Sequence, residues 1–155
     1  MPQPNEDYIK KMMNIVNQSH FPKHMHMRLA ALSFDRATIA LDTAQCHLQP
    51  FGIVHGGAIA TLIDTATFWC AFLRIPEGDG LVNIDLKLNY LRSVSKGRLI
   101  AEGRCLRAGR SISYADASVT DRKGNLVAHG TSTLMVLPGK GLDVGVPKFS
   151  DDVTQ

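Results

Sequence analysis

The sequence predicts an α+β fold in which a curved antiparallel sheet wraps around one long central helix, with a short helix at the N-terminus. Two observations lead to this prediction. The segment 56–74 is apolar on almost every side, as expected of a helix enclosed by other structure. After it, apolar and polar residues alternate with a period of two, which is typical of strands with one solvated face. A single enclosed helix needs a sheet that curls around it.

The elements before the central helix are short. Residues Asn5–Asn17 place their apolar side chains at helical spacing, which predicts an amphipathic helix that ends before Pro22. Two strands are expected next, Met27–Ser33 and Ala37–Asp42, joined by a polar turn. The loop 43–54 then leads into the central helix.

Four strands are expected after the central helix, separated by Gly-containing or polar turns that suit an antiparallel meander. The predicted strands are Val82–Tyr90, Gly97–Leu106, Ser111–Asp121 and Leu126–Val136.

The composition is that of one globular domain outside the nucleic-acid-binding class. The chain has 155 residues, of which 45% are hydrophobic, with 17 Lys and Arg against 14 Asp and Glu. This apolar content excludes disorder as the main state, and the dispersed positive charges argue against a nucleic-acid partner. The apolar stretch Ala58–Leu73 contains Asp64, so we expect no membrane span. Three cysteines without a CxxC pair, and no signal-peptide pattern, predict a cytoplasmic protein.

Two adjacent glycines stand where the central helix is expected to begin. The backbone N–H groups of Gly56 and Gly57 would be exposed at the positive end of the helix dipole. Such a helix start can hold a phosphate, a carboxylate or a developing oxyanion. The alternative is that the glycines only allow the loop to pack closely on the sheet, and spacing alone does not separate the two.

Asp64 is the anomalous residue of the central helix, because it lies among apolar neighbours. Desolvation there raises the pKa of a carboxyl group, and a carboxylate perturbed in this way is typical of a general base or nucleophile. The alternative is a structural aspartate satisfied by Thr61 or Thr67, three residues to either side.

Gly56 and Asp64 cannot serve one reacting group within a single chain. They are eight residues apart, about 12 Å along a helix, whereas a base and an oxyanion donor must both lie within about 3 Å of the reacting atoms. Two antiparallel helices related by a two-fold axis would bring Gly56 of one chain near Asp64 of the other. If the motif is catalytic, a homodimer is the smallest active unit.

The segment Gly52-x-x-His55-Gly56-Gly57, followed by Leu62 and Asp64, resembles the signature of hotdog-fold acyl-CoA thioesterases of the PaaI-like, 4-hydroxybenzoyl-CoA thioesterase-related group. The resemblance covers about residues 20–137, including 109–111 and 121–128. It implies a hotdog fold and a homotetramer of paired dimers. The chain would then divide into an N-terminal helix (1–19), a hotdog thioesterase domain (20–138) and a flexible Gly-rich C-terminal tail (139–155).

The resemblance implies roles for individual residues in thioester hydrolysis. Asp64 would act as general base or nucleophile, and the Gly56 N–H would polarise the thioester carbonyl. His55 would brace the loop, unless it is simply a structural histidine. Asn83 stands where the family often has Ser or Thr and would hold the attacking water, unless it is only a polar residue on the wet face. Gln49 replaces the usual Asn and keeps an amide with one more methylene of reach.

The implied substrate is an acyl-CoA, with no separate cofactor. Gly57 at the helix start and two arginines near a tight turn, Arg107 and Arg110, are the residues expected to bind the CoA part; most other basic side chains are a solvated surface. The acyl slot would be lined by Phe68, Trp69 and Phe72, which at helical spacing could equally be plain core.

Two other functions fit parts of the sequence. His20, His24 and His26 form an H-x3-H-x-H cluster, but Pro22 should separate the first two and no spaced Cys or carboxylate completes a metal site. The stronger rival is a non-catalytic acyl-CoA-binding or regulatory hotdog protein, which would keep the pocket without hydrolysis. Retention of Asp64 favours the enzyme, because a ligand pocket alone does not require a buried carboxylate.

Overall fold

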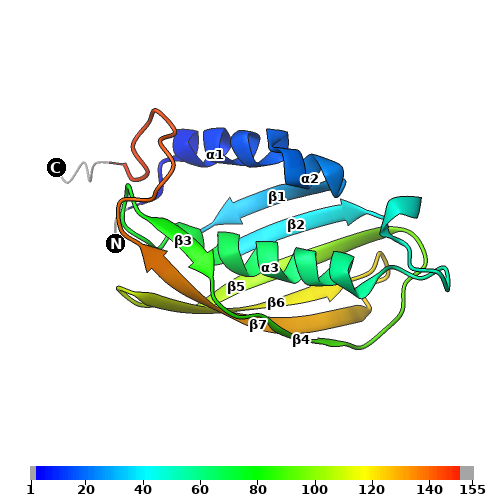
Figure 1. The fold of residues 1–155 in the computed structure, drawn as a ribbon. Coiled ribbons are helices and arrows are strands. Elements are labelled where there is room, and N and C mark those ends of the chain that lie inside the picture. The colour runs from blue at the N-terminus through cyan, green and yellow to red at the C-terminus, as the bar shows by residue number, and fades with distance from the viewer. Residues whose placement is uncertain (1–2, 151–155) are drawn as a thin grey trace.

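A seven-stranded antiparallel sheet curls around helix α3 in the computed structural model, which describes residues 3–150 (Figure 1). The strand order is β1-β2-β5-β6-β7-β3, and β4 also pairs with β7. This confirms the predicted α+β architecture. The helices are α1 (Glu6–Gln18), α2 (His20–His24) and α3 (Gly56–Phe72), with a 3-10 turn at Gln45–His47. The strands are β1 (Met27–Ser33), β2 (Arg36–Asp42), β3 (Gly80–Asn83), β4 (Lys87–Tyr90), β5 (Arg98–Ala108), β6 (Ile112–Thr120) and β7 (Leu126–Leu137).

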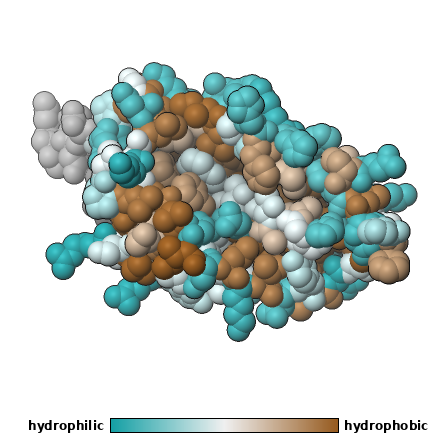
Figure 2. Space-filling model, in the orientation of Figure 1, coloured by the Kyte–Doolittle hydropathy of each residue, from teal (hydrophilic) through white to brown (hydrophobic). Residues whose placement is uncertain are grey.

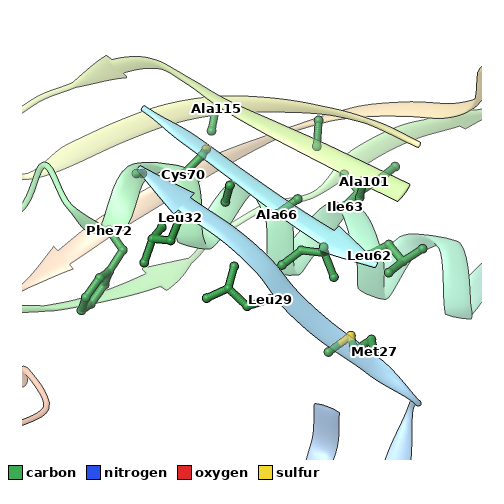
Figure 3. Close-up of a cluster of buried hydrophobic side chains, with 14 of the residues drawn as sticks. Met27, Leu29, Leu32, Leu62, Ile63, Ala66, Cys70, Phe72, Ala101 and Ala115 are labelled. Atoms are coloured by element: carbon green, nitrogen blue, oxygen red, sulfur yellow. The ribbon is translucent and has the colours of Figure 1, made fainter. Parts of the chain in front are cut away.

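The core lies between α3 and the concave face of the sheet. Leu62, Ile63 and Ala66 of α3 are fully buried against the inward-facing side chains of the strands (Figure 3). The helix approaches β5 at Gly103, where an added Cβ would lie 2.2 Å from the Ala66 carbonyl oxygen. A side chain at this position would push the helix off the sheet, and the contact therefore sets how deeply α3 is seated.

One face of α3 is not enclosed, which corrects the expectation of a helix buried on almost every side. The residues on this face recur at intervals of three or four, the spacing of a single helical stripe. They are half-buried or exposed in the single chain: Gly57, Ala60, Thr61, Asp64, Thr65 and Phe68. We call them the open stripe of α3. The sequence pattern missed the stripe because its members are small or apolar, except Asp64 and two threonines.

The predicted strand Val82–Tyr90 is split into β3 and β4. Between them Asp85 takes over part of the ladder, because its carboxylate accepts the Thr133 N–H of β7 at 2.7 Å. The Asp85 carbonyl oxygen also accepts the Ser132 hydroxyl at 2.7 Å. A side chain that hydrogen-bonds to the neighbouring backbone competes with regular strand pairing. The strand is therefore interrupted at Asp85, although the alternation of apolar and polar residues in the sequence continues through the interruption.

The N-terminal helical region is longer than expected. Helix α1 ends at Gln18, but α2 follows at once and contains Pro22, which is tolerated because it lies in the first turn. His20 and His24 therefore share one short helix, contrary to the expectation that Pro22 separates them. Both helices lie along β1 (Figure 1).

Residues 139–150, which we call the terminal segment, lie against the rest of the chain, whereas the sequence led us to expect a flexible tail. The Phe149 ring stacks on Phe34 with centroids 6.4 Å apart. The Lys148 side chain is 2% exposed, and its Nζ donates to the carbonyl oxygens of Phe72 at 2.6 Å and Ile75 at 2.8 Å. Because this segment is rich in glycine, the sequence pattern did not identify Lys148 and Phe149 as residues that anchor it. The remaining residues of the expected tail, 151–155, lie outside the described part of the chain.

Candidate active site

Asp64 lies half-buried in the open stripe of α3. Its carboxylate oxygen Oδ1 accepts a hydrogen bond from the Asn83 amide at 3.0 Å. The same amide nitrogen lies 3.2 Å from the Asp64 carbonyl oxygen, so Asn83 at the end of β3 holds both the backbone and the side chain of Asp64. Burial raises the pKa of the Asp64 carboxyl above its ordinary value, and the Asn83 hydrogen bond opposes that rise.

The two threonines that could have made Asp64 a structural residue do not bond its carboxylate. Thr61 Oγ1 donates to the Gly57 carbonyl at 2.9 Å, and Thr67 Oγ1 lies 2.9 Å from the Ile63 carbonyl and 3.0 Å from that of Asp64. Both hydroxyls are thus used for back-bonding within the helix. Sequence reasoning placed Asn83 facing the site but missed its direct bond to Asp64, because the two residues are 19 positions apart.

At the start of α3, His55 is the N-cap residue, and its Nδ1 accepts the Gly57 N–H at 2.8 Å. The Gly56 N–H has no hydrogen-bond partner within residues 3–150. Tyr90 of β4 packs over this glycine, and its hydroxyl donates to the Gly56 carbonyl at 3.0 Å. A Cβ on Gly56 would lie 2.9 Å from the Tyr90 ring, so only glycine fits here without displacing Tyr90. The Gly57 N–H is thus occupied, and Gly56 keeps the open donor.

Gln49 and Gly56 line the same cavity, of about 400 Å³, together with Tyr90 and Arg92. We call it the Gly56 cavity. Gln49 Oε1 accepts the Phe51 N–H at 2.6 Å, which holds the loop in a tight turn. The Gln49 amide nitrogen remains as the donor of this side chain, and it stands at the end of α3 that carries the open N–H.

Asp64 lines a different cavity, of about 360 Å³, which we call the Asp64 cavity. Its walls come from α1, α2, β1, the C-terminal half of α3 and the terminal segment. Phe68 and Trp69 lie in this wall, as expected for an acyl slot, whereas Phe72 is buried beneath the Lys148 ammonium group. Within one chain, Asp64 and Gly56 therefore open into separate cavities.

Arg107 and Arg110 lie far from the start of α3 in the same chain. They line a cavity of about 510 Å³ at the β5–β6 turn. Positions along β7 give the distance between Gly56 and these arginines. Ala128 of β7 pairs with Tyr90, which contacts Gly56. Leu134 of β7 lies at the end of the sheet that carries Arg107. These six residues of strand span about 20 Å.

A second basic cavity adjoins the Gly56 cavity. Its volume is about 520 Å³, and four basic residues line it: Arg92, Lys96, Arg122 and Lys123. Arg92 and Ser93 border both cavities, so the two are continuous along the surface. Sequence analysis assigned most basic side chains other than Arg107 and Arg110 to a solvated surface, because the loop after β4 and the 121–125 turn meet only in the folded chain.

A group of possible metal ligands occurs at His26, Cys46 and His47, whose ligand atoms lie within 4.8 Å of one another. His47 Nδ1 accepts the Ala44 N–H at 2.8 Å, and its Nε2 lies 2.9 Å from the Met25 carbonyl oxygen. Both ring nitrogens are therefore engaged in holding the loop, and two ligands alone do not make a metal centre. No helix among the described residues is long and apolar enough to cross a membrane.

Comparisons with known proteins show which proteins this chain is similar to. The thioesterase superfamily model matches residues 51–128, which include the residues just before α3, α3 itself and β3. The proofreading thioesterase EntH of Klebsiella pneumoniae is 38% identical over 76 residues, covering 49% of this chain and 56% of that protein. EntH of Cronobacter turicensis is 28% identical over 114 residues, covering 72% of this chain and 82% of that protein. The structure of thioesterase HI1161 from Haemophilus influenzae superposes with a TM-score of 0.81 at 22% identity, covering 91% of this chain and 98% of that one, and shares the hotdog fold.

Proposed function

The chain belongs to the thioesterase superfamily of hydrolases, and from that premise we propose that it hydrolyses an acyl-CoA to the free acid and CoA. The observation that carries the proposal is the half-buried Asp64 carboxylate, which Asn83 holds and which faces a cavity, with no salt-bridge partner within residues 3–150. A carboxylate kept in this setting without a cationic partner costs stability, and catalysis gives a reason for its presence.

In this mechanism Asp64 accepts a proton from a water molecule as the water oxygen attacks the thioester carbonyl carbon. The carbonyl electrons move onto oxygen, and the Gly56 N–H, aided by the helix dipole, stabilises the oxyanion. When the tetrahedral intermediate collapses, the C–S bond breaks and the CoA thiolate takes up the proton from Asp64. Direct attack by the carboxylate, followed by hydrolysis of the resulting anhydride, gives the same products. Asn83 orients the carboxylate, Gln49 lies beside the oxyanion end, and His55 braces the loop.

The active site is composite in this proposal. Asp64 and Gly56 open into separate cavities of one chain, and the open stripe between them begins with the small residues Gly57, Ala60 and Thr61. Small residues allow the helices of two chains to approach closely in an antiparallel pair. The pair would place Gly56 of one subunit beside Asp64 of its partner. The dimer is the active unit, and we propose that two dimers assemble into a tetramer in the cytoplasm.

The CoA part of the substrate supplies phosphate groups for the basic cavities. Arg107 and Arg110 would approach a CoA held at a composite site, since the partner's chain runs in the opposite direction. The cavity with Arg92 and Arg122 offers a second place, continuous with the Gly56 cavity. Arg110→Gln and Arg122→Gln separate these two. If a cavity binds the CoA phosphates, substitution of its arginine should raise KM for acyl-CoA. The same substitution should leave KM unchanged for a thioester that lacks the nucleotide.

The function is tested by measuring thiol release from a panel of aryl- and fatty-acyl-CoAs. Binding of the same compounds to the protein is measured in parallel. Hydrolysis of any member at an enzymatic rate supports the proposal. Binding of the acyl-CoAs without thiol release would replace it with the non-catalytic acyl-CoA-binding protein.

A further inference from the structure

We infer that the Asp64 cavity selects an unsubstituted aliphatic acyl group of medium length, up to about twelve carbons. The inference rests on the proposed function, because it takes Asp64 as the group that addresses the thioester. It adds a substrate class and the residues that select it. The cavity opens at Asp64 and is walled by side chains that the sequence places in separate elements: Ile15 of α1, Phe21 of α2, Trp69 of α3 and Leu142 of the terminal segment.

The lining of the Asp64 cavity is apolar, and its hydroxyl groups are already engaged. Ser19 Oγ donates to the Val16 carbonyl at 2.6 Å, and Thr65 Oγ1 donates to the Thr61 carbonyl at 2.7 Å. Two polar groups then remain among the described lining residues: the Asp64 carboxylate and the indole N–H of Trp69. A charged or hydroxylated acyl group would lose its water and meet few hydrogen-bonding groups in a lining that is mostly apolar. Hydroxylated aryl groups are therefore disfavoured relative to a plain alkyl chain.

The size of the cavity sets the length of the chain. Its volume is about 360 Å³, more than twice that of an engineered apolar cavity that holds one benzene ring, about 150 Å³. A methylene group takes about as much room as a water molecule, about 30 Å³. At about 30 Å³ per carbon, the cavity of the single chain holds up to about twelve carbons. A two- or four-carbon acyl group would leave most of it unfilled.

The mouth of the cavity is bordered by large apolar side chains that one chain leaves in contact with water. Phe21 is 56% exposed, Leu142 is 55% exposed and Ile15 is 38% exposed. Figure 2 shows hydrophobic side chains at α1 and over β3 on this face of the molecule, with teal groups between them. Exposed apolar surface of this kind marks a ligand or partner site. Because Asp64 shares its wall, the acyl chain of the substrate is the occupant to which we commit.

The terminal segment holds one wall in place. Leu142 reaches the cavity from a stretch whose two ends are tied to the body of the protein. The Gly141 N–H donates to the Gly78 carbonyl at 2.8 Å, and Lys148 is anchored at the end of α3. Helices α1 and α2 form the opposite wall. Both walls lie outside residues 51–128, the part that the family model matches. They are therefore the part of this chain that can set its own acyl preference.

The experiment compares butanoyl, octanoyl, hexadecanoyl, benzoyl and 4-hydroxybenzoyl thioesters of N-acetylcysteamine and of CoA. The N-acetylcysteamine series keeps the acyl group and the thioester but lacks the nucleotide, so it isolates the acyl cavity. The wild-type protein should show its highest kcat/KM with the octanoyl group. The 4-hydroxybenzoyl group should be about 10- to 100-fold poorer, since an apolar pocket discriminates only modestly against an added hydroxyl.

Two variants change the cavity in opposite directions. Ile15→Trp fills it from α1 and should lower kcat/KM for octanoyl thioesters at least tenfold relative to butanoyl. Phe21→Ala opens it and should shift the preference toward hexadecanoyl. Matched controls are Asn14→Trp, on the same helix but outside the cavity lining, and Phe51→Ala, whose ring is 90% exposed elsewhere. Both controls should leave the octanoyl-to-butanoyl ratio unchanged.

The outcomes separate this inference from the proposed function. If the wild-type protein hydrolyses no member of either series, the proposed function fails. If it hydrolyses thioesters but prefers 4-hydroxybenzoyl, the function stands and the acyl inference is wrong. The same holds if folded Ile15→Trp and Phe21→Ala both keep the wild-type chain-length profile.

Discussion

The two ends of α3 differ in whether their backbone groups have hydrogen-bond partners. At the N-terminal end the Gly56 N–H has no partner among the described residues, and eight residues along the helix Asp64 faces a cavity. At the C-terminal end the Lys148 ammonium group donates to the carbonyl oxygens of Phe72 and Ile75 and lies 4.4 Å from the Phe72 ring centroid. Unpaired groups at helix ends are normally satisfied by caps or water. One end of this helix is open to a substrate, and the other is sealed.

The comparison separates two meanings of a shifted pKa. Burial raises the pKa of Asp64 and lowers that of Lys148 to about 8, so both groups carry the same physical perturbation. Asp64 borders a cavity, whereas Lys148 is 2% exposed and has its hydrogens directed at backbone carbonyls. Burial with access to a cavity indicates chemistry, and burial without it indicates architecture. The variants below should therefore divide cleanly between activity and stability.

Asp64→Asn should have the largest effect on activity. It removes the proton acceptor or nucleophile while keeping a side chain of the same shape, and we expect kcat to fall by about 10²- to 10⁴-fold. The free energy of unfolding should stay the same or rise, because the cost of burying a carboxylate disappears. Thiol release and urea unfolding measure the two sides. A loss of activity accompanied by equal loss of stability would show that Asp64 belongs to the architecture instead.

Gly56→Ala should follow, with a loss of about 10²-fold in kcat, comparable to removing one oxyanion donor. The new Cβ would lie 2.9 Å from the Tyr90 ring, so Tyr90 must move and the Gly56 N–H shifts with the loop. Tyr90→Phe is the matched control: it keeps the ring and removes only the hydroxyl that bonds the Gly56 carbonyl. Its effect on kcat should be smaller. If the two variants lose equal activity, the hydroxyl rather than the position of the N–H is what matters.

Substitution of Asn83 should change the pH dependence of activity. Its amide stabilises the ionised Asp64 and lowers the pKa of that carboxyl against the effect of burial. In Asn83→Ala the pKa of Asp64 should rise further, so the acid limb of the kcat/KM profile should move to higher pH. The several-fold loss of kcat/KM should then be greatest below neutrality. Asn83→Ser keeps a donor and should move the limb less. A uniform loss at every pH would mean that Asn83 acts on water and not on the carboxylate.

Lys148→Met should affect stability without affecting catalysis. Burial lowers the pKa of Lys148 from 10.5 to about 8 in the folded chain. Between these values the unfolded chain carries a proton that the folded chain does not, so wild-type stability should rise with pH across this window and level off below it. The rise should be on the order of 1 kcal/mol or more. Chemical denaturation of Lys148→Met should lack it, while kcat stays unchanged. A wild-type curve that falls across the window would contradict the buried position of Lys148.

Much of the fold was predictable because it depends on periodicity. The change from the helical pattern of 56–74 to alternating strands identified a sheet around a helix, and the glycine pair marked where the helix begins. The break at Asp85 could not be predicted, since it arises from a side-chain bond to Thr133, 48 residues away. The anchoring of Lys148 was hidden for the same reason, because its partners belong to the end of α3.

The candidate site was predictable only in part. Asp64 and Gly56 stood out because a carboxylate and an open helix start are anomalous where they occur in the sequence. The contact between Asp64 and Asn83, and the cavity walls from Ile15, Phe21 and Leu142, depend on tertiary neighbours that periodicity does not specify. Local chemistry could thus be read from the chain, whereas the partners that tune it could not.

The central claim is that Asp64 of one subunit works with Gly56 of the other, and subunit complementation tests it directly. Differently tagged Asp64→Asn and Gly56→Ala chains are co-expressed, and dimers that contain one of each are isolated. Each hybrid then holds one composite site with both residues intact, so it should recover about half of the wild-type activity, since a two-fold dimer has two equivalent sites. If the two residues act within one chain, both subunits of the hybrid are defective, and a hybrid as inactive as its parents would contradict the account.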